Sequence, residues 1–441
     1  MDSEFLSLPS DLVLEVSKHL DLADAIHLLS TCRTLRECCT EKSFWIGALA
    51  RVRQEQRHPI AVPLLQDLSA LTLAELAEAG KRTNRLMRNW RSETPKPESV
   101  REIYVDLMAD IVVIPGANLV ITHGAGFVAC WDIVRQCSVG CLVENGIMIE
   151  SATFGEYGKV MLGATKRNSS CFDAVVVCVD YRNRAAVSIS LLLQHTFAYP
   201  RRHSYQVSPV SVDANIARVV VTTLEPWNYT LLSVSLAGNE ETRYGLMPAA
   251  TRSIGVYGPP KTSIISSPHG PYFLRHMRDY GDIAHLSNSP GTPPTTTTTP
   301  LGTPNNSFQI KHFIPADPTA DVVCITSGQF TVEFWPVQRD ADAQLVFGDI
   351  YFVRRRPRRL IGVVAGSSGT YALVALHPGG SLDEAPLRLL RCVPGGALDY
   401  RDIRVPDKTL YAKEGQIALD DHLGLILSVR GDGRLRIASY A

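Results

Sequence analysis

Apolar residues recur every four positions near the amino terminus. In the segment SLPSDLVLEVSKHL these positions are Leu8, Leu12, Val16 and Leu20, and Val13 lies beside them. A four-residue spacing places the side chains on one stripe of an amphipathic helix. The pattern therefore predicts a helix whose one face is apolar.

A similar pattern continues in DLADAIHLLSTCRTLRECC, where Asp21 or Asp24 can cap a second helix. The residues expected to face inward in this helix are Ile26, Leu28, Leu29, Cys32 and Leu35. A third short helix ends near SFWIGALARV. We expect a three-helix module over residues 5–50.

Residues 61–93 predict a helical connector. Thr72 and Glu75 have the spacing of a capping box at the start of the helix LAELAEAGKRTNRLMRNW. The segment SETPKPES then contains two prolines and no apolar residue, which favours a domain boundary.

Beyond about residue 100 the pattern changes to short alternating or apolar runs separated by Gly, Pro, Asn and Asp. A hairpin recurs with second strands near 131, 179, 234, 277, 335, 391 and 438, a spacing of roughly 40 to 60 residues that is typical of propeller blades. We expect an all-β domain over residues 100–441, a β-propeller with seven blades preferred and six or eight open. Within it, the low-complexity segment 287–307 predicts a loop.

The last hairpin, GLILSVRGDGRLRIASYA, is not followed by an outer strand. The segment REIYVDL, residues 101–107, precedes the first blade and could supply that strand. Because an unpaired sheet edge leaves backbone groups open to association, we predict that these two distant segments pair.

Composition narrows the functional classes. Lys plus Arg and Asp plus Glu each total 44, so no overall field steers the chain toward nucleic acid or an anionic membrane. No stretch reaches the roughly 18 to 20 apolar residues of a membrane span. The ten cysteines form no C-x-x-C pair and the histidines no H-E-x-x-H motif, which predicts reduced thiols and no metal or other cofactor. The expected location is the cytoplasm or the nucleus.

The amino-terminal segment resembles the F-box family. The resemblance rests on Leu8 and Pro9 followed by Asp11 and Leu12, on the segments DLAD and LLSTCRTLR, and on the pair Phe44-Trp45. It implies helices that bind a Skp-type adaptor, which links the chain to a cullin and RING ubiquitin ligase. The implied adaptor-binding residues are Leu8, Pro9, Leu12, Val16, Leu20, Leu28, Leu29, Cys32, Leu35 and Trp45. An ordinary helical hairpin that packs on its own chain is the alternative.

The β-rich part is similar to WD-repeat propellers, through Trp131-Asp132 in FVACWDI and the turn Asp432-Gly433 in the last hairpin. The other hairpins lack the Trp-Asp step. With the helical connector, the whole arrangement resembles fungal F-box proteins.

Three motifs suggest chemistry that their context does not support. Gly124-Ala125-Gly126 fits a dinucleotide fingerprint but leads into a strand rather than a helix, so we expect a hairpin turn. AGSSG around Ser367 predicts a loop, and Asp420-Asp421-His422 predicts structural hydrogen bonds at a turn.

The basic run RRRPRR, 354–359, has three possible interpretations: a nuclear signal, a contact for acidic targets or a solvated loop.

Two functional hypotheses follow. The first is a non-catalytic substrate-recognition subunit of a Skp-cullin-F-box ubiquitin ligase, whose propeller binds a protein target. The alternative is a protein-interaction scaffold outside any ligase, in which the F-box-like region merely packs on the propeller. The target cannot be identified from the sequence, because propeller specificity depends on loop side chains.

Overall fold

The fold is seen in a computed structural model of the chain. It describes residues 9–31, 33–38, 41–105, 110–124, 126–167, 171–198, 205–208, 210–213, 215–224, 227–237, 240–246, 360–376 and 416–441, and the strands of the remaining range as bounded below. For the strands between 261 and 354 it describes the backbone alone. Leu8 and Cys32 lie outside the described residues.

The amino-terminal module contains four helices rather than three: α1 (Ser10–Ser17), α2 (Leu22–Thr31), α3 (Arg33–Cys38) and α4 (Lys42–Gln54). The expected second helix is divided into α2 and α3. At the end of α2, the hydroxyl of Thr31 donates to the carbonyl oxygen of Leu28 at 2.6 Å, and Ser30 does the same to His27. Such hydroxyl bonds compete with the helical pattern and favour its termination.

The connector consists of a 3-10 turn, η2 (Leu68–Ala70), and α5 (Leu73–Arg91). The predicted capping box is confirmed: the Thr72 hydroxyl accepts from Glu75 N, and the Glu75 carboxylate accepts from Thr72 N at 2.8 Å. Both contacts satisfy amide groups that the first helical turn would leave unpaired.

The strands form seven antiparallel sheets among the described residues. Sheet 1 contains β2 (Asp110–Ile114), β3 (Leu119–Gly124), β4 (Phe127–Asp132) and β5 (Cys137–Val143); sheet 2 contains β6 (Met148–Glu156), β7 (Lys159–Arg167), β8 (Cys171–Asp180) and β9 (Ser188–Ala198). Sheet 3 contains β10 (Tyr205–Val207), β11 (Ser211–Asp213), β12 (Ile216–Leu224), β13 (Trp227–Ser235) and β14 (Glu241–Leu246); sheet 4 contains β15 (Lys261–Ile265), β16 (Tyr272–His276), β17 (Gly281–His285) and β18 (Thr295–Thr299). Sheet 5 contains β19 (Phe308–Asp317), β20 (Ala320–Ser327), β21 (Thr331–Arg339), β22 (Leu345–Phe347) and β23 (Tyr351–Arg354). Sheet 6 contains β24 (Leu360–Ala365), β25 (Tyr371–Leu376), β26 (Leu387–Arg391) and β27 (Asp399–Ile403); sheet 7 contains β28 (Ile417–Asp420), β29 (Leu425–Val429), β30 (Arg434–Ser439) and β1 (Ser99–Tyr104).

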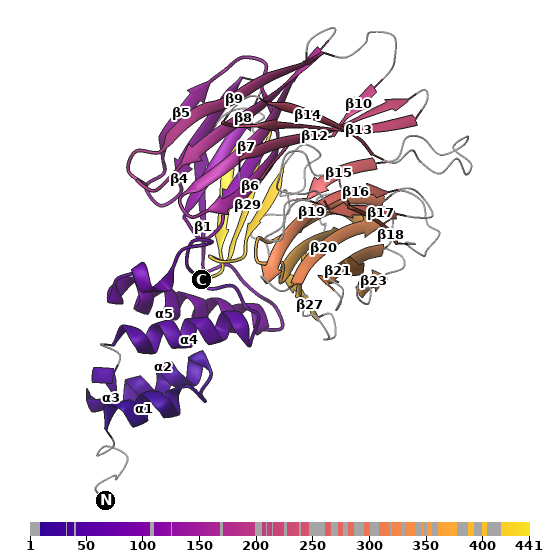
Figure 1. The fold of residues 1–441 in the computed structure, drawn as a ribbon. Coiled ribbons are helices and arrows are strands. Elements are labelled where there is room, and N and C mark those ends of the chain that lie inside the picture. Colours follow the sequence, from indigo (N-terminus) through magenta and orange to yellow (C-terminus); the bar gives the residue numbers. More distant parts are fainter. Residues whose placement is uncertain are drawn as a thin grey trace, which may run out of the picture.

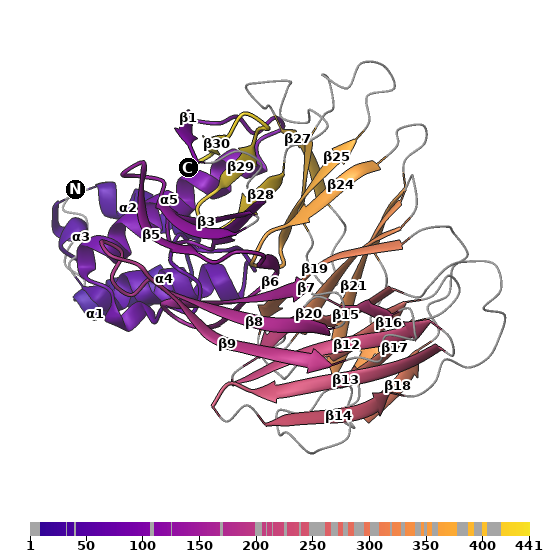
Figure 2. The same ribbon diagram turned by 90° about the horizontal axis from the view of Figure 1, so that it is seen from above.

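Neighbouring sheets touch in chain order around the domain (Figures 1 and 2). The ring closes where β2 of sheet 1 contacts β28 of sheet 7. Each sheet supplies one antiparallel blade, so the domain is a β-propeller. Because parts of the chain between 247 and 415 are not described, the preferred blade number of seven stays a prediction.

Ring closure follows the prediction from the unpaired last hairpin. Strand β1 pairs antiparallel with β30, with Ile103 opposite Leu435, and the amide of Val105 donates to Gly433 O at 2.8 Å. The paired strand begins at Ser99, two residues before the predicted segment. Ile103 and Leu435 are buried in one core, so closure also buries apolar surface.

The prediction of a loop over residues 287–307 is partly wrong. The threonine run of this segment forms β18, which pairs with β17. Threonine is β-branched and suits a strand, a preference that outweighs the low complexity of the segment. Its other residues, including those that precede β18, lie outside the described residues.

Candidate functional site

An apolar stripe on α1 faces solvent. Leu12 is 47% exposed and Val16 is 39% exposed, whereas Val13 between them is buried in the helical core. The helical period explains this division, because residues 12 and 16 lie on the same face of the helix and residue 13 lies on a different one. Pro9, just before the helix, is also exposed.

The other predicted adaptor-binding residues are divided between the surface and the core. Leu20 and Leu28 are half-buried at the edge of the helical core. Leu29 and Leu35 are each only 4% exposed, inside that core. These two residues therefore support the fold of the module, and the surface that a partner can reach consists of the exposed and half-buried ones.

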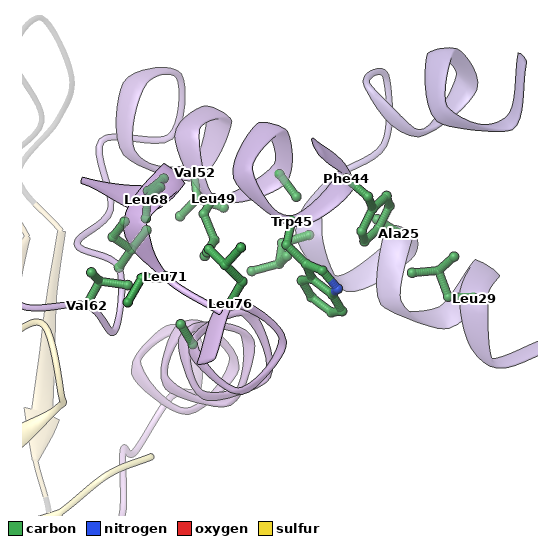
Figure 3. Close-up of a cluster of buried hydrophobic side chains, with 14 of the residues drawn as sticks. Ala25, Leu29, Phe44, Trp45, Leu49, Val52, Val62, Leu68, Leu71 and Leu76 are labelled. Carbon is green, nitrogen blue, oxygen red and sulfur yellow. The ribbon is translucent and has the colours of Figure 1, made fainter. Parts of the chain in front are cut away.

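Trp45 also lies in the interior, at 3% exposure (Figure 3). Its ring packs edge-on against Phe44, with centroids 5.1 Å apart, and lies directly over Gly80 of α5. A Cβ atom at Gly80 would lie 2.5 Å from the ring, so only glycine leaves room for it. Of the aromatic pair that the F-box resemblance singled out, Trp45 thus forms the contact between α4 and α5.

Helix α5 joins two hydrophobic cores. Near its start, Leu76 and Ala79 pack in the helical core with Trp45. Near its end, Leu86 and Trp90 are buried with residues of sheets 6 and 7, and the rings of Trp90 and Tyr371 are 4.6 Å apart. The connector is therefore packed at both ends rather than being a flexible linker.

Residues 57–64, which we call the strap, cross the same end of the propeller. The hydroxyl of Thr370 donates to Arg57 O at 2.9 Å, and His422 Nδ1 lies 3.0 Å from Ile60 O. The amide of Leu64 donates to Pro115 O at 3.1 Å. The strap thus contacts sheet 6, sheet 7 and sheet 1 in succession.

The acidic cluster before the last hairpin is structural, as predicted. The carboxylate of Asp420 accepts from the amide groups of Gly116, His422 and Leu423. Burial raises the pKa of Asp420 to about 6. The carboxylate of Asp421 accepts from the Ser368 amide and both serine hydroxyls of AGSSG, and it fixes the loop between β24 and β25.

The other motifs have structural roles too. Gly124 and Gly126 form the hairpin turn between β3 and β4, where Gly126 has a φ of +100°. Trp131 Nε1 donates to Thr122 Oγ1 at 2.9 Å across the same hairpin. Of the basic run, Arg354 ends β23, and residues 355–359 lie outside the described residues.

No group of three or more His, Cys, Asp or Glu side chains within the described residues is arranged to hold a metal ion. The five cysteines that can be described there, Cys130, Cys137, Cys141, Cys171 and Cys178, are free thiols. Among the described helices, none combines the length and the apolar character that crossing a membrane requires.

Two features of this region were missed by sequence reasoning. The strap has no periodic pattern, and its contacts with the propeller depend on residues that follow it by more than 50 positions in the chain. Gly80 did carry a signal, because a glycine inside an exposed amphipathic helix is costly and indicates a close contact.

Comparison with known proteins gives one family match, the F-box domain, at residues 5–47. No curated protein matches the chain. Similar solved structures include a crystal structure of the mitotic checkpoint complex (14% identity, TM-score 0.45, covering 79% of this chain and 93% of that chain). The WD40 domain of SCAP from fission yeast is similar at 10% identity and a TM-score of 0.37, with 78% of this chain and 94% of that chain covered. The C-terminal WD40 domain of Sif2 is similar at 9% identity and a TM-score of 0.40, with 73% and 78% covered. At these scores the propeller assignment rests on strand pairing and on the contacts between sheets.

Proposed function

We propose that this chain, which carries an F-box domain ahead of a β-propeller, is the substrate-recognition subunit of a Skp-cullin-F-box ubiquitin ligase. In this proposal α1 and its neighbours bind a Skp-type adaptor, and the propeller binds a protein target. The chain itself is proposed to be non-catalytic.

The observation that carries the proposal is the exposed stripe of Leu12 and Val16 within the matched F-box domain. Large apolar side chains that share one helical face and remain in water favour a partner helix or groove. In this proposal the exposed Pro9 and the half-buried Leu20 and Leu28 would extend the contact.

The position of the stripe supports the same function. Helices α1, α2 and α3 lie beyond α4, on the side away from the propeller (Figure 1). An adaptor bound there would leave the propeller free for a target. Because α5 is packed into both cores, the two binding regions would keep a fixed separation.

The test is binding of a purified Skp-type adaptor to the full chain, measured by calorimetry. The double variant Leu12→Asp and Val16→Asp should lose at least tenfold in affinity, because hot-spot residues typically contribute about 2 kcal/mol or more each. A matched control is Val134→Asp with Val143→Asp, since these propeller residues are 58% and 70% exposed. Equal adaptor affinity for the stripe variant and the wild type would refute the proposal.

The alternative, a scaffold outside any ligase, is favoured by one observation: the helical module is already packed on the propeller through α5. It predicts that the wild-type chain binds no Skp-type adaptor while the stripe variant keeps the same melting temperature. The calorimetric experiment therefore distinguishes the two functions.

A further inference from the structure

Two arginines meet where the connector joins the propeller. Arg91 is in the last turn of α5, and Arg391 ends strand β26 of sheet 6. Arg91 Nη2 donates to the side-chain oxygen of Gln56 at 3.2 Å, and Arg391 Nη2 donates to the backbone oxygen of Gln56 at 2.9 Å. Two guanidinium groups that are 300 positions apart in sequence are thus brought to one glutamine.

Neither arginine forms an ion pair among the described residues. The nearby Asp399 is 3.2 Å from Arg401, and Asp421 accepts from Ser367 and Ser368. Burial has the largest influence on the pKa of the Tyr371 hydroxyl and raises it overall. The charges of Arg391 and Arg91 lower this pKa. Their effect is larger than the opposite effect of Asp421 and Asp399. At this hydroxyl the two guanidinium groups therefore outweigh the two carboxylates.

Two strand arginines of sheets 6 and 7 have a carboxylate partner. Arg388 pairs with Asp402, and Arg436 pairs with Glu102. A basic residue in the last turn of α5 is favoured by the helix dipole, but the dipole does not account for Arg391, which is on a strand. Within the described residues neither Arg91 nor Arg391 has an ion-pair partner; Asp399, the cross-strand neighbour of Arg391, contacts Arg401 instead.

Two donors near this junction, Arg391 Nε and Trp90 Nε1, are buried and form no hydrogen bond within the described residues. The Nδ1 atom of His58 lies 2.6 Å from Pro59 O, to which it donates, so its buried Nε2 atom is an acceptor. The two cations also act on His58, whose pKa burial lowers to about 3, so the imidazole is neutral at physiological pH. Buried donors are normally paired, and each unpaired one costs about 1 to 3 kcal/mol.

We propose that Arg91 and Arg391 form an oxyanion site that takes a phosphate group at the junction of the connector and the propeller. Guanidinium groups bind phosphate oxygens through parallel charge-assisted hydrogen bonds, and two of them match a doubly charged group. A bound phosphate would connect the end of α5, the residue Gln56 after α4 and the end of strand β26 in sheet 6. It would therefore strengthen the attachment of the helical module to the propeller. This site is independent of the adaptor-binding stripe on α1.

The experiment is thermal unfolding of the full chain in increasing inorganic phosphate, with chloride adjusted to constant ionic strength. The melting temperature of the wild type should rise and then saturate, since a ligand that binds only the folded state stabilises it. The variant Arg91→Gln with Arg391→Gln should lose this rise. Arg85→Gln, on the exposed side of α5 and paired with Glu78, should respond as the wild type does.

If the double variant does not fold, Arg91→Gln alone provides the test, because this side chain is exposed. Its apparent dissociation constant for phosphate, measured by phosphorus NMR line broadening, should be at least tenfold weaker. An equal response of the wild type, Arg85→Gln and the arginine variants would overturn the proposal, because it would show a general salt effect.

A second arm identifies the source of the phosphate. A peptide carrying phosphoserine should bind more tightly than inorganic phosphate, and than the same peptide without the modification, if the group is carried on a polypeptide. Binding of inorganic phosphate with no gain from the peptide would assign the site to the free anion. In either case the arginine variants must abolish the binding.

Discussion

Asn89 Nδ2 lies 2.9 Å from the carbonyl oxygen of Tyr440, the penultimate residue, so helix α5 is hydrogen-bonded to the end of the chain. The same amide group also donates to Lys96 O, and Asn89 Oδ1 accepts from Lys96 N. One side chain thus joins the connector, the segment that follows it and the residue that follows the last strand.

Replacement of Asn89 by Ala should lower the free energy of unfolding by about 1 to 3 kcal/mol, because it leaves partly buried backbone groups unpaired. Urea denaturation measures this change. Lys81→Ala, on the exposed face of the same helix, should stay within about 0.5 kcal/mol of the wild type. Similar losses for both variants would mean that the Asn89 contacts do not stabilise the junction.

Gly80→Ala should destabilise the chain although alanine is the better helix former. The new Cβ would lie 2.5 Å from the Trp45 ring, and forcing an added carbon into a packed core typically costs about 1 to 3 kcal/mol. Gly47→Ala on α4 is the control, since the nearest atom, on the Arg51 side chain, would be 3.6 Å away. That variant should gain up to about 1 kcal/mol. Opposite signs in thermal unfolding are the expected result, and a stabilised Gly80→Ala would contradict the packing of Trp45.

Ile103→Ala tests the closure of the ring. Ile103 is buried opposite Leu435, and truncation of such a side chain costs about 2 to 5 kcal/mol. Tyr104→Ala changes the next residue of the same strand, which is 63% exposed, and should cost less than about 1 kcal/mol. If chemical denaturation gives equal losses, the apolar contact between β1 and β30 is not what closes the ring.

Acid should weaken the junction through His58. Burial lowers the pKa of His58 from 6.5 to about 3, so below pH 6.5 the unfolded chain binds a proton that the folded chain does not. The contribution of His58 to the free energy of unfolding is therefore present above pH 6.5 and is lost as the pH falls toward 3. Between pH 7 and pH 5 the wild type should lose about 2 kcal/mol more than His58→Gln.

Asp420 changes the stability with pH in the opposite direction. Its pKa is raised to about 6, so the folded state gains stability as the pH falls from about 6 to 4. The comparison with His58→Gln removes this contribution, since both proteins contain Asp420. Equal pH profiles of the two proteins would show that His58 is not buried in its neutral form.

The thiols should differ in reactivity. Burial raises the pKa of the Cys130 thiol to about 12, so almost no thiolate forms at pH 8. Cys137 and Cys141 are exposed on β5. Iodoacetamide followed by peptide mass spectrometry should label these two in the folded protein and label Cys130 only after denaturation. Early labelling of Cys130 would contradict its burial.

Local signals in the sequence were sufficient for several of these elements. Thr72 and Glu75 predict the start of α5, because a capping box involves only one helical turn. The pairing of β1 with β30 was predictable as well, because the last hairpin alone would leave an unpaired edge.

The division of the apolar residues in the helical module was not predictable. Periodicity indicates that Leu12 and Leu29 each lie on an apolar face, but it does not indicate which face meets α5. Burial of Leu29 and exposure of Leu12 depend on how α2, α4 and α5 pack. The meeting of Arg91 with Arg391 is likewise set by the closed ring, which no local pattern describes.

Because α5 is packed in a different core at each end, a rotation of the helix at one end moves the other end. Its 19 residues span about 28 Å at 1.5 Å per residue. A rotation of about 10° at Trp90 would displace Gly80, beneath the Trp45 ring, by about 3 Å and the start of the helix at Leu73 by about 4 Å. Small changes in the packing of one aromatic side chain would therefore appear as large displacements of whatever is attached to the far end of the helix.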